Sequence, residues 1–427
     1  MRQLLNIGYA VLFAQVLCPK IRAQVYADNL PVDHPAIQYW QTAPNDPIAR
    51  LAKQIESGKV KLEYQEGGLG YLPSLLELLG INSDSQALVF SKTSFQASKI
   101  SPRNPRAIYF SDDAAVGWVQ GGEGFELAGL DPRQGIVFYS LALQKTPTPR
   151  IVRRDVCLKC HQGPATSGVP GIFVGSVFPD PSGNPSAVGA IVTDYRTAFE
   201  DRWGGWYVNA QRGEQRDRAN SVAPNPAEPE ALETEGRQNL TRFVREFDAT
   251  GYLTPISDIV ALMTFEHQTQ MTNLMTRVGW EARIAEHDQA GAAQTDAGVE
   301  TLVAYMLFAE EAPLRATIEG VSTFAKTFPQ RGPRDRRGRS LRDFDLETRL
   351  FKYPLSFMIY SAAFDNMPSD VRERVYKRLH EILTGQDRSG KFAKLSAEDR
   401  KSILEIVADT KTNLPEDWRA TGSRVSR

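Results

Sequence analysis

The sequence has very little cysteine and no excess of charge of either sign. Its 427 residues include three cysteines, too few for the disulfide framework of a small secreted scaffold. Fifty basic residues against 51 acidic ones give a net charge of −1, so no basic field indicates nucleic acid as the main partner. The hydrophobic fraction of 41% and the charged fraction of 24% are ordinary for a globular protein. This composition excludes collagen-like, wholly disordered and multi-span membrane proteins.

Long hydrophobic runs are also scarce. One apolar segment, Leu4–Leu17, follows the positively charged Arg2 and is typical of a signal peptide. We expect residues 1–23 to be removed after Ala23, with Ala27 as an alternative cleavage position, and the mature protein to be exported to the periplasm. An uncleaved anchor or a buried first helix is the alternative. No later segment reaches the length and apolarity of a transmembrane helix, so no stable membrane span is expected in the mature chain.

The hydrophobic periodicity divides the mature chain into two parts. Residues 28–210 begin with helical spacing and then carry short β-rich runs separated by Gly, Pro, Asn and Asp, which predict a mixed, β-rich part. Residues 211–236 are polar and indicate a linker or a long loop. Residues 237–420 are mostly helical in pattern, including an expected helix from Leu314 towards Phe328 and a last helix whose capping box is Ser396 with Asp399. The predicted fold class is therefore α+β.

One short motif in the β-rich part carries chemistry, Cys157-Leu158-Lys159-Cys160-His161. Cys-x-x-Cys-His is the attachment signature of c-type haem. Two thiols at this spacing can each add to one vinyl group of the same porphyrin edge, and the adjacent imidazole is then held under the ring to ligate iron. The motif predicts one covalent haem c, held through Cys157 and Cys160, with His161 as proximal iron ligand. Once Cys18 leaves with the signal peptide, no other cysteine remains.

Three alternatives compete with haem. A zinc site needs four ligands, and the missing ones would have to come from His34, His267, His287 or His380. A thioredoxin-like redox pair follows a strand and opens a helix, whereas Gly- and Pro-rich loops follow this motif. A chance match is expected in fewer than roughly one chain in a thousand of this composition. We therefore favour haem.

The sixth position of the iron has two candidate ligands. Met263, His267, Met271 and Met275 recur every four residues and share one helix face, with His267 at its centre. His267 is the favoured second metal ligand, and the alternative is a core stripe that contains one buried histidine. Met358 is the rival ligand, and its alternative is a position in a buried helix start.

Two further clusters have open interpretations. The segment Arg331–Arg342 holds six arginines, which could bind haem propionates or an acidic redox partner, or could form a solvated loop. The segment Arg202–Tyr207 places two tryptophans around a glycine pair. These rings could pack on the porphyrin or in the core.

The motif makes the chain resemble a c-type cytochrome. The wider sequence resembles a family of large, exported, single-haem bacterial proteins with a cytochrome c domain, in the stretches Ser101–Arg106, Arg202–Val208, Asp258–Gln268 and Leu350–Ser361. This resemblance implies a shared fold and names no reaction. The small all-α cytochrome c fold is not expected throughout, because strand-like runs flank the motif and no methionine lies between His161 and Met263.

The expected function follows from the motif and the export signal. The first hypothesis is an exported monohaem c-type cytochrome that transfers electrons to or from a redox partner protein. The alternative is a haem enzyme, peroxidase- or oxidase-like, or a small-gas-binding protein with an open sixth site. The large amount of protein around one haem favours this alternative somewhat, so the sequence leaves enzymatic activity and oligomeric state open.

Overall fold

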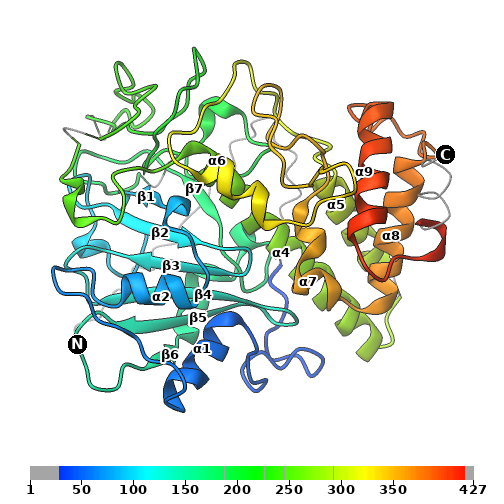
Figure 1. The fold of residues 1–427 in the computed structure, drawn as a ribbon, viewed down its shortest axis with the longest axis horizontal. Helices are drawn as coiled ribbons and strands as arrows, with labels where there is room; N and C mark the ends of the chain where they lie inside the picture. The colour runs from blue at the N-terminus through cyan, green and yellow to red at the C-terminus, as the bar shows by residue number, and fades with distance from the viewer. Residues whose placement is uncertain (1–27, 187, 226, 244–245, 292, 419–427) are drawn as a thin grey trace, which may run out of the picture.

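The computed structural model describes residues 28–418 except 187, 226, 244–245 and 292. The expected signal peptide, residues 1–23, and the alternative cleavage at Ala27 therefore lie outside the described residues. A seven-stranded antiparallel sheet forms the N-terminal part, and helices dominate the C-terminal part (Figure 1). The predicted α+β class is confirmed. Within the described ranges, no helix combines the length and apolarity that crossing a membrane requires.

The sheet is a meander in which strands that follow one another in the chain also pair in space. Its order is β6-β5-β4-β3-β2-β1-β9, so only the last pair joins strands distant in sequence. Its strands are β1 Ala87–Val89, β2 Arg106–Phe110, β3 Ala114–Trp118, β4 Gly124–Asp131, β5 Gly135–Ala142, β6 Ile151–Arg153 and β9 Trp206–Tyr207. The tight β4–β5 turn needs Gly135 at φ 81°, and Asp131 accepts backbone hydrogen bonds from Arg133 and Gln134.

Helices α1 (Pro47–Glu56) and α2 (Leu72–Leu78) lie in front of the sheet in Figure 1. Asp46 caps α1, because its Oδ1 accepts hydrogen bonds from the backbone of Ile48 and Ala49 at 2.8 and 3.0 Å. The same carboxylate accepts a hydrogen bond from the hydroxyl of Tyr139 on β5. One buried side chain therefore both starts α1 and fixes it to this face of the sheet.

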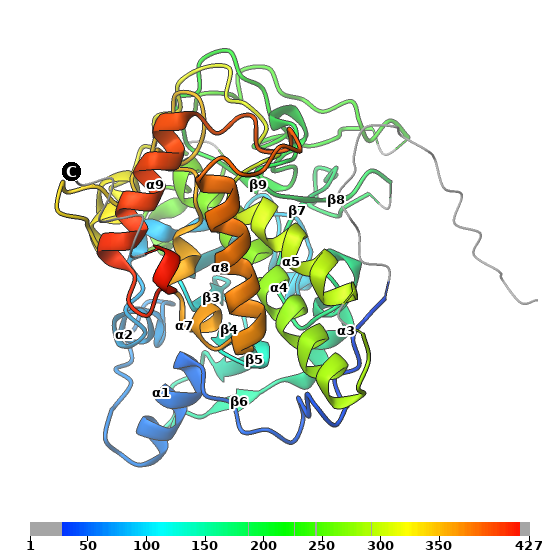
Figure 2. The same ribbon diagram turned by 90° about the vertical axis from the view of Figure 1, so that its right-hand side faces the viewer.

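The 29-residue helix α4 (Ile259–His287) lies between the sheet and the other helices (Figures 1 and 2). Asp258 caps it through Val260 N, and its second carboxylate oxygen accepts from the backbone of Val321 and Ser322. Phe265 packs on Phe110 of β2 with ring centroids 4.6 Å apart. One continuous hydrophobic core joins the sheet and the helices through α4.

The remaining elements complete two layers. A hairpin of β7 (Val174–Ser176) and β8 (Ile191–Thr193) lies apart from the large sheet. The other helices are α3 Leu158–His161, α5 Ala293–Met306, α6 Phe324–Thr327, α7 Ala362–Asp365, α8 Ser369–Leu383 and α9 Ala397–Thr410. Figure 2 shows α4, α5 and α8 side by side. The capping box of Ser396 and Asp399 starts α9, as the sequence predicts.

The helix expected from Leu314 towards Phe328 is wrong over most of its length. Only α6 forms within it, because partners elsewhere in the fold take up the backbone groups before α6. Ile318 N donates to Leu346 O at 2.8 Å, in addition to the contacts of residues 321 and 322 with the α4 cap. Tertiary hydrogen bonds override the helical spacing of this segment.

Residues 211–236 form a long loop that packs on the rest of the protein. Its described residues, all but 226, form no helix or strand, yet Arg212 and Asp217 form a fully buried ion pair inside the segment. Gln211 pairs with Glu319 by a backbone bridge, which ties the loop to the helical part. Of the two predicted possibilities, a long loop describes this stretch better than a free linker.

Candidate functional site

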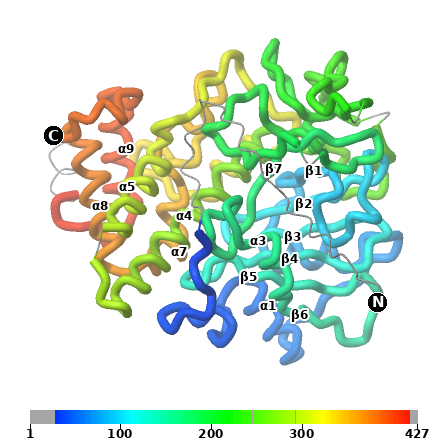
Figure 3. The backbone as a smooth tube through the Cα atoms, turned by 180° about the vertical axis from the view of Figure 1, so that it is seen from behind, coloured from blue at the N-terminus to red at the C-terminus, as the bar shows by residue number. Residues whose placement is uncertain are grey.

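The cysteine motif lies on a short helical turn that crosses one face of the sheet. Helix α3 follows β6 after a 3-10 turn, Asp155–Cys157, and lies beside the first described residues of the chain (Figure 3). Leu158 is buried and anchors the turn, whereas Cys157 is partly exposed and Cys160 is exposed. Both thiols are free. The two sulfur-bearing side chains are thus accessible to a group bound outside α3.

A backbone carbonyl fixes the orientation of His161. Its Nδ1 lies 3.0 Å from Gly171 O, and Gly171 N donates back to His161 O at 2.9 Å. Nδ1 must therefore carry the proton, which leaves the lone pair of Nε2 free for a metal. Burial lowers the pKa of His161, opposed by the Gly171 hydrogen bond, and so favours the neutral, ligating form.

Helix α4 contacts the loop that contains Gly171, whose carbonyl orients His161. Gly171 approaches α4 so closely that an added Cβ would lie 2.1 Å from Asn273 Oδ1. Asn273 also donates to Ile172 O at 3.0 Å. The absence of a side chain at Gly171 permits this approach, and the approach places the carbonyl that accepts from His161.

The cysteine environment argues against a thiolate site. Burial raises the pKa of Cys157 to about 11, and the nearby Glu126 carboxylate raises it further. A redox-active or zinc-bound cysteine needs an electropositive setting that favours the thiolate. Across residues 28–418, apart from the gaps named above, three or more His, Cys, Asp or Glu ligands cluster only at His34, His287 and Asp288. The zinc and thioredoxin-like alternatives therefore lose support.

The sheet face under His161 carries both apolar and charged side chains. The rings of Phe138 and His161 lie 4.8 Å apart between centroids. Phe138 pairs with Ala128, so Glu126, two residues away on β4, points to the same face. Arg106 of β2 donates to Glu126 at 2.7 Å, and both side chains are partly exposed. Gly117 lies opposite Glu126 on β3 and leaves space between the charged pair and the neighbouring strand.

The β7–β8 hairpin supplies a second wall beside His161. Phe173, which precedes β7, lies 5.9 Å from His161 between ring centroids. Its ring passes 3.6 Å from the position of a Cβ on Gly175, and Gly175 pairs with Val192. These three residues therefore share the hairpin face that is turned to His161.

Exposed apolar side chains gather around the motif. Val156 directly precedes Cys157 and is 45% exposed, Val152 on β6 is 47% exposed, and Val192 on the hairpin is 41% exposed. Val152 pairs with Ser140, which places it on the same sheet face as Phe138. Seven large hydrophobic residues of the described chain are exposed, and these three lie on the turn, strand and hairpin next to the motif. A clustered apolar surface of this kind is typical of a site that another group covers.

These residues fit a covalently bound haem. The macrocycle is a flat apolar group, and Phe173 and the three exposed valines offer apolar contact near His161, whose ring also packs on the buried Phe138. The thiols needed for attachment are reduced and accessible on the same turn. Trp206 ties the end of the sheet to the hairpin, since its Nε1 donates to Gly175 O at 2.7 Å.

The structure does not bring His267 to this site. His267 is fully buried and stacks on Tyr305 and Phe308, with centroids 5.5 and 4.6 Å away. Its Nε2 lies 2.8 Å from Ser356 Oγ. Asn273, which faces the motif loop, is six residues further along α4, so His267 points about 120° away around the helix. Burial lowers its pKa to about 3 and keeps the ring neutral. These contacts favour the core alternative for His267.

Met358 and the two other clusters also lie elsewhere. Met358 is 1% exposed, in the turn Phe357–Tyr360 that packs in the helical part. Trp203 of the Arg202–Tyr207 segment is fully buried in the core. Five of the six arginines of the segment 331–342 form ion pairs within this chain, and Arg331 instead lies over the rings of Phe324 and Phe328. The pairs are Arg334–Asp343, Arg336–Asp409, Arg337–Glu405, Arg339–Asp335 and Arg342–Asp112. These five positive charges are therefore paired with carboxylates of the same chain.

Sequence reasoning missed a buried carboxylate beneath the hairpin. Glu266, next to His267, is fully buried, and its Oε1 accepts from Thr193 Oγ1 of β8 at 2.6 Å. Arg202 lies 3.6 Å from Oε2. Burial raises the pKa of Glu266 to about 7, although Arg202 and Thr193 oppose the rise. The sequence feature that could have indicated this buried carboxylate is a glutamate within an apolar stretch of the segment that forms α4.

Glu266 gives the first testable prediction. Because its folded-state pKa lies above the ordinary value of 4.5, ionisation destabilises the native state increasingly as the pH rises from about 4.5 to about 7. Glu266→Gln cannot ionise, so its stability relative to the wild type should improve over this range by about 1–3 kcal/mol. Urea denaturation at pH 5 and pH 8 measures this change. The exposed Glu310→Gln is the control, and a pH-independent difference for Glu266→Gln would contradict the prediction.

Comparison of the chain with protein-family models, with curated proteins and with solved structures finds no match. The site is therefore interpreted from its own geometry.

Proposed function

We propose that this protein is an exported, periplasmic c-type cytochrome with one covalent haem, which transfers electrons to or from a redox partner protein. The observation that carries the proposal is the environment of His161. Its Nδ1 is held by Gly171 O, its Nε2 is free, and exposed apolar side chains surround it next to two free thiols. A histidine with its Nδ1 hydrogen-bonded and its Nε2 free, next to a Cys-x-x-Cys pair, suits the role of proximal haem ligand.

Several residues of this chain would have distinct roles at such a site. When bound, haem supplies an iron that changes reversibly between its ferric and ferrous states. Cys157 and Cys160 would hold the group by thioether bonds, and the Gly171 carbonyl would raise the basicity of His161 as a ligand. The Arg106–Glu126 pair places a positive and a negative charge on the adjacent sheet face, where their balance would tune the reduction potential of a bound haem.

A second candidate function is a haem enzyme or a small-gas binder with an open sixth position. It is favoured by the positions of His267 and Met358, which contact the helical core rather than the motif. Without a strong sixth ligand from the protein, the iron would be accessible to water or to a small molecule.

One experiment tests the proposal and separates the two candidates. We expect the protein, matured with a c-haem assembly system, to titrate as a single reversible one-electron couple. Its ferrous spectrum with and without CO reports whether the sixth position is open. His161→Ala should abolish the native spectrum, whereas Lys159→Ala, on the same turn, should leave it intact. Absence of a reversible couple would contradict electron transfer, and rapid CO binding would favour the second candidate.

A further inference from the structure

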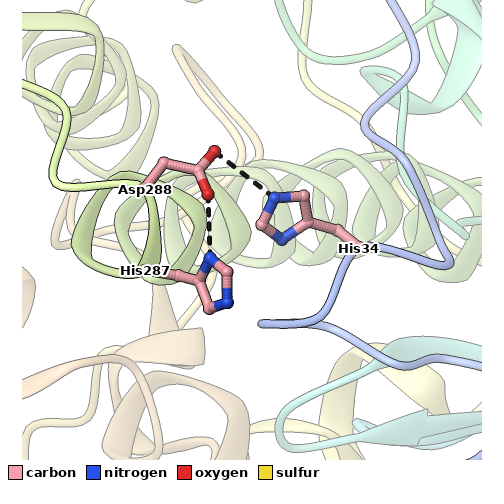
Figure 4. Close-up of side chains that lie close together, drawn as sticks. All are labelled: His34, His287 and Asp288. Atoms are coloured by element: carbon pink, nitrogen blue, oxygen red, sulfur yellow. Dashed lines mark hydrogen bonds and ion pairs between the residues drawn. The ribbon is translucent and has the colours of Figure 1, made fainter.

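Two histidines and an aspartate from distant parts of the chain meet on the surface. His34 lies near the start of the described chain, His287 is the last residue of α4, and Asp288 caps that helix. Asp288 Oδ1 lies 2.8 Å from His287 Nδ1, and Asp288 Oδ2 lies 3.4 Å from His34 Nε2 (Figure 4). The two imidazole rings are 5.2 Å apart between centroids. The sequence gives no sign of this meeting.

The geometry points to a metal site: we propose that His34, His287 and Asp288 bind a divalent transition-metal ion. One potential ligand atom of each residue lies within 4.8 Å of the other two, which is close enough for one ion to contact all three. The set of two imidazoles and a carboxylate suits Zn²⁺, Cu²⁺ or Ni²⁺, whereas Ca²⁺ and Mg²⁺ prefer oxygen ligands throughout.

The surroundings of the three residues match this chemistry. His287 and Asp288 have side chains 48% and 46% exposed, so an ion can reach them, while His34 is 16% exposed and more firmly held. Asp288 supplies the carboxylate oxygens of the set, which both face the two imidazole rings. Three protein ligands leave a further position for water or another small ligand.

Metal binding through Nε2 of His34 would give up one hydrogen bond of its ring. His34 Nδ1 accepts a hydrogen bond from Ala36 N at 3.2 Å, so the neutral ring carries its proton on Nε2. Coordination through Nε2 moves this proton to Nδ1 and gives up the long contact with Ala36. The metal bond replaces it, together with the contact of His34 with Asp288.

The proposed ion would stabilise the position of the segment that contains Leu30 and His34, which lies beside the cysteine motif. Leu30 O accepts from Gln162 Nε2 at 2.7 Å, and Leu30 N donates to Gly168 O at 2.9 Å. Gln162 directly follows His161. A metal that joins His34 to the end of α4 would therefore stabilise the segment that covers the flank of the motif loop, without contacting the thiols.

Calorimetric titration of the mature holoprotein with Zn²⁺, and separately with Cu²⁺, tests the proposal. We expect one equivalent to bind, the unfolding temperature to rise, and the described N-terminal segment to resist proteolysis. His34→Gln and His287→Gln should each weaken binding at least tenfold, and the double variant should abolish it. His380→Gln, at a histidine outside the cluster, is the matched control and should bind as the wild type does.

Three outcomes would overturn the proposal. They are the absence of saturable binding of either ion, binding that persists in the double variant, and binding that His380→Gln removes. The haem spectrum of each variant, recorded without added metal, shows whether the fold is retained. Because His287 is half exposed, His287→Gln is the variant expected to fold normally and gives the decisive comparison.

Discussion

Replacing Cys157 and Cys160 together by alanine is expected to abolish covalent haem attachment. The two thioether bonds have no other source, since the only further cysteine, Cys18, lies in the expected signal peptide. Each single variant should keep one thioether and attach haem in lower yield. Haem staining of the denatured protein and its intact mass measure the loss directly.

Lys159→Ala is the matched control for the cysteine variants. Lys159 lies between the two cysteines on α3 and is exposed, so its replacement changes the same turn without removing a thiol. The control should attach haem as the wild type does. If the double cysteine variant still carried haem after denaturation, the motif would not be the attachment site.

His267→Ala is expected to destabilise the protein strongly and to leave the haem spectrum unchanged. The variant removes a fully buried ring that stacks on Tyr305 and Phe308 and contacts Ser356 Oγ. Loss of such an aromatic side chain from a core costs about 3–5 kcal/mol of unfolding free energy. Denaturant unfolding measures the loss, and the ferric and ferrous spectra test the iron.

Ser356→Ala is the control for His267. It removes the hydrogen bond to the ring and the one that Ser356 Oγ accepts from Met358 N at 3.2 Å, each worth about 1 kcal/mol, and leaves the ring in place. A shift of the ferric spectrum towards high spin in His267→Ala, with new CO binding, would contradict the core interpretation. It would establish His267 as the sixth ligand, as the sequence pattern predicts, and Met358→Ala would then serve as the negative comparison.

The sheet was predictable because most of its strands pair with the strand next to them in the chain. The runs that begin at Ala87, Ala107 and Phe125 form β1, β2 and β4, because each is a short β-rich run between turn residues and antiparallel neighbours need only short turns. The segment before α6 failed because its spacing is helical while its backbone is bound by Asp258 and Leu346. Local patterns cannot report partners so distant in the chain.

The sequence identifies the motif residues of the candidate site, and it does not identify their surroundings. Spacing alone identifies Cys157, Cys160 and His161 as a set. The approach of Gly171 to Asn273 and the charged pair of Arg106 with Glu126 depend on strand register and on the position of α4.

The stripe around His267 shows the limit of periodicity. A spacing of four places residues on one helix face, yet it does not say which neighbour that face meets. In the fold this face meets aromatic rings of the helical part rather than the motif. The meeting of His34 with His287 is equally invisible in sequence, because nothing local connects the two residues.

The most direct test of the central claim is the mass of the exported wild-type protein after denaturation, followed by peptide mapping. The account predicts a mass above that of the processed polypeptide by one haem, carried by the peptide that contains Cys157, Cys160 and His161. An unmodified mass, with both cysteines open to alkylation after export in a strain that assembles c-type haem, would contradict it.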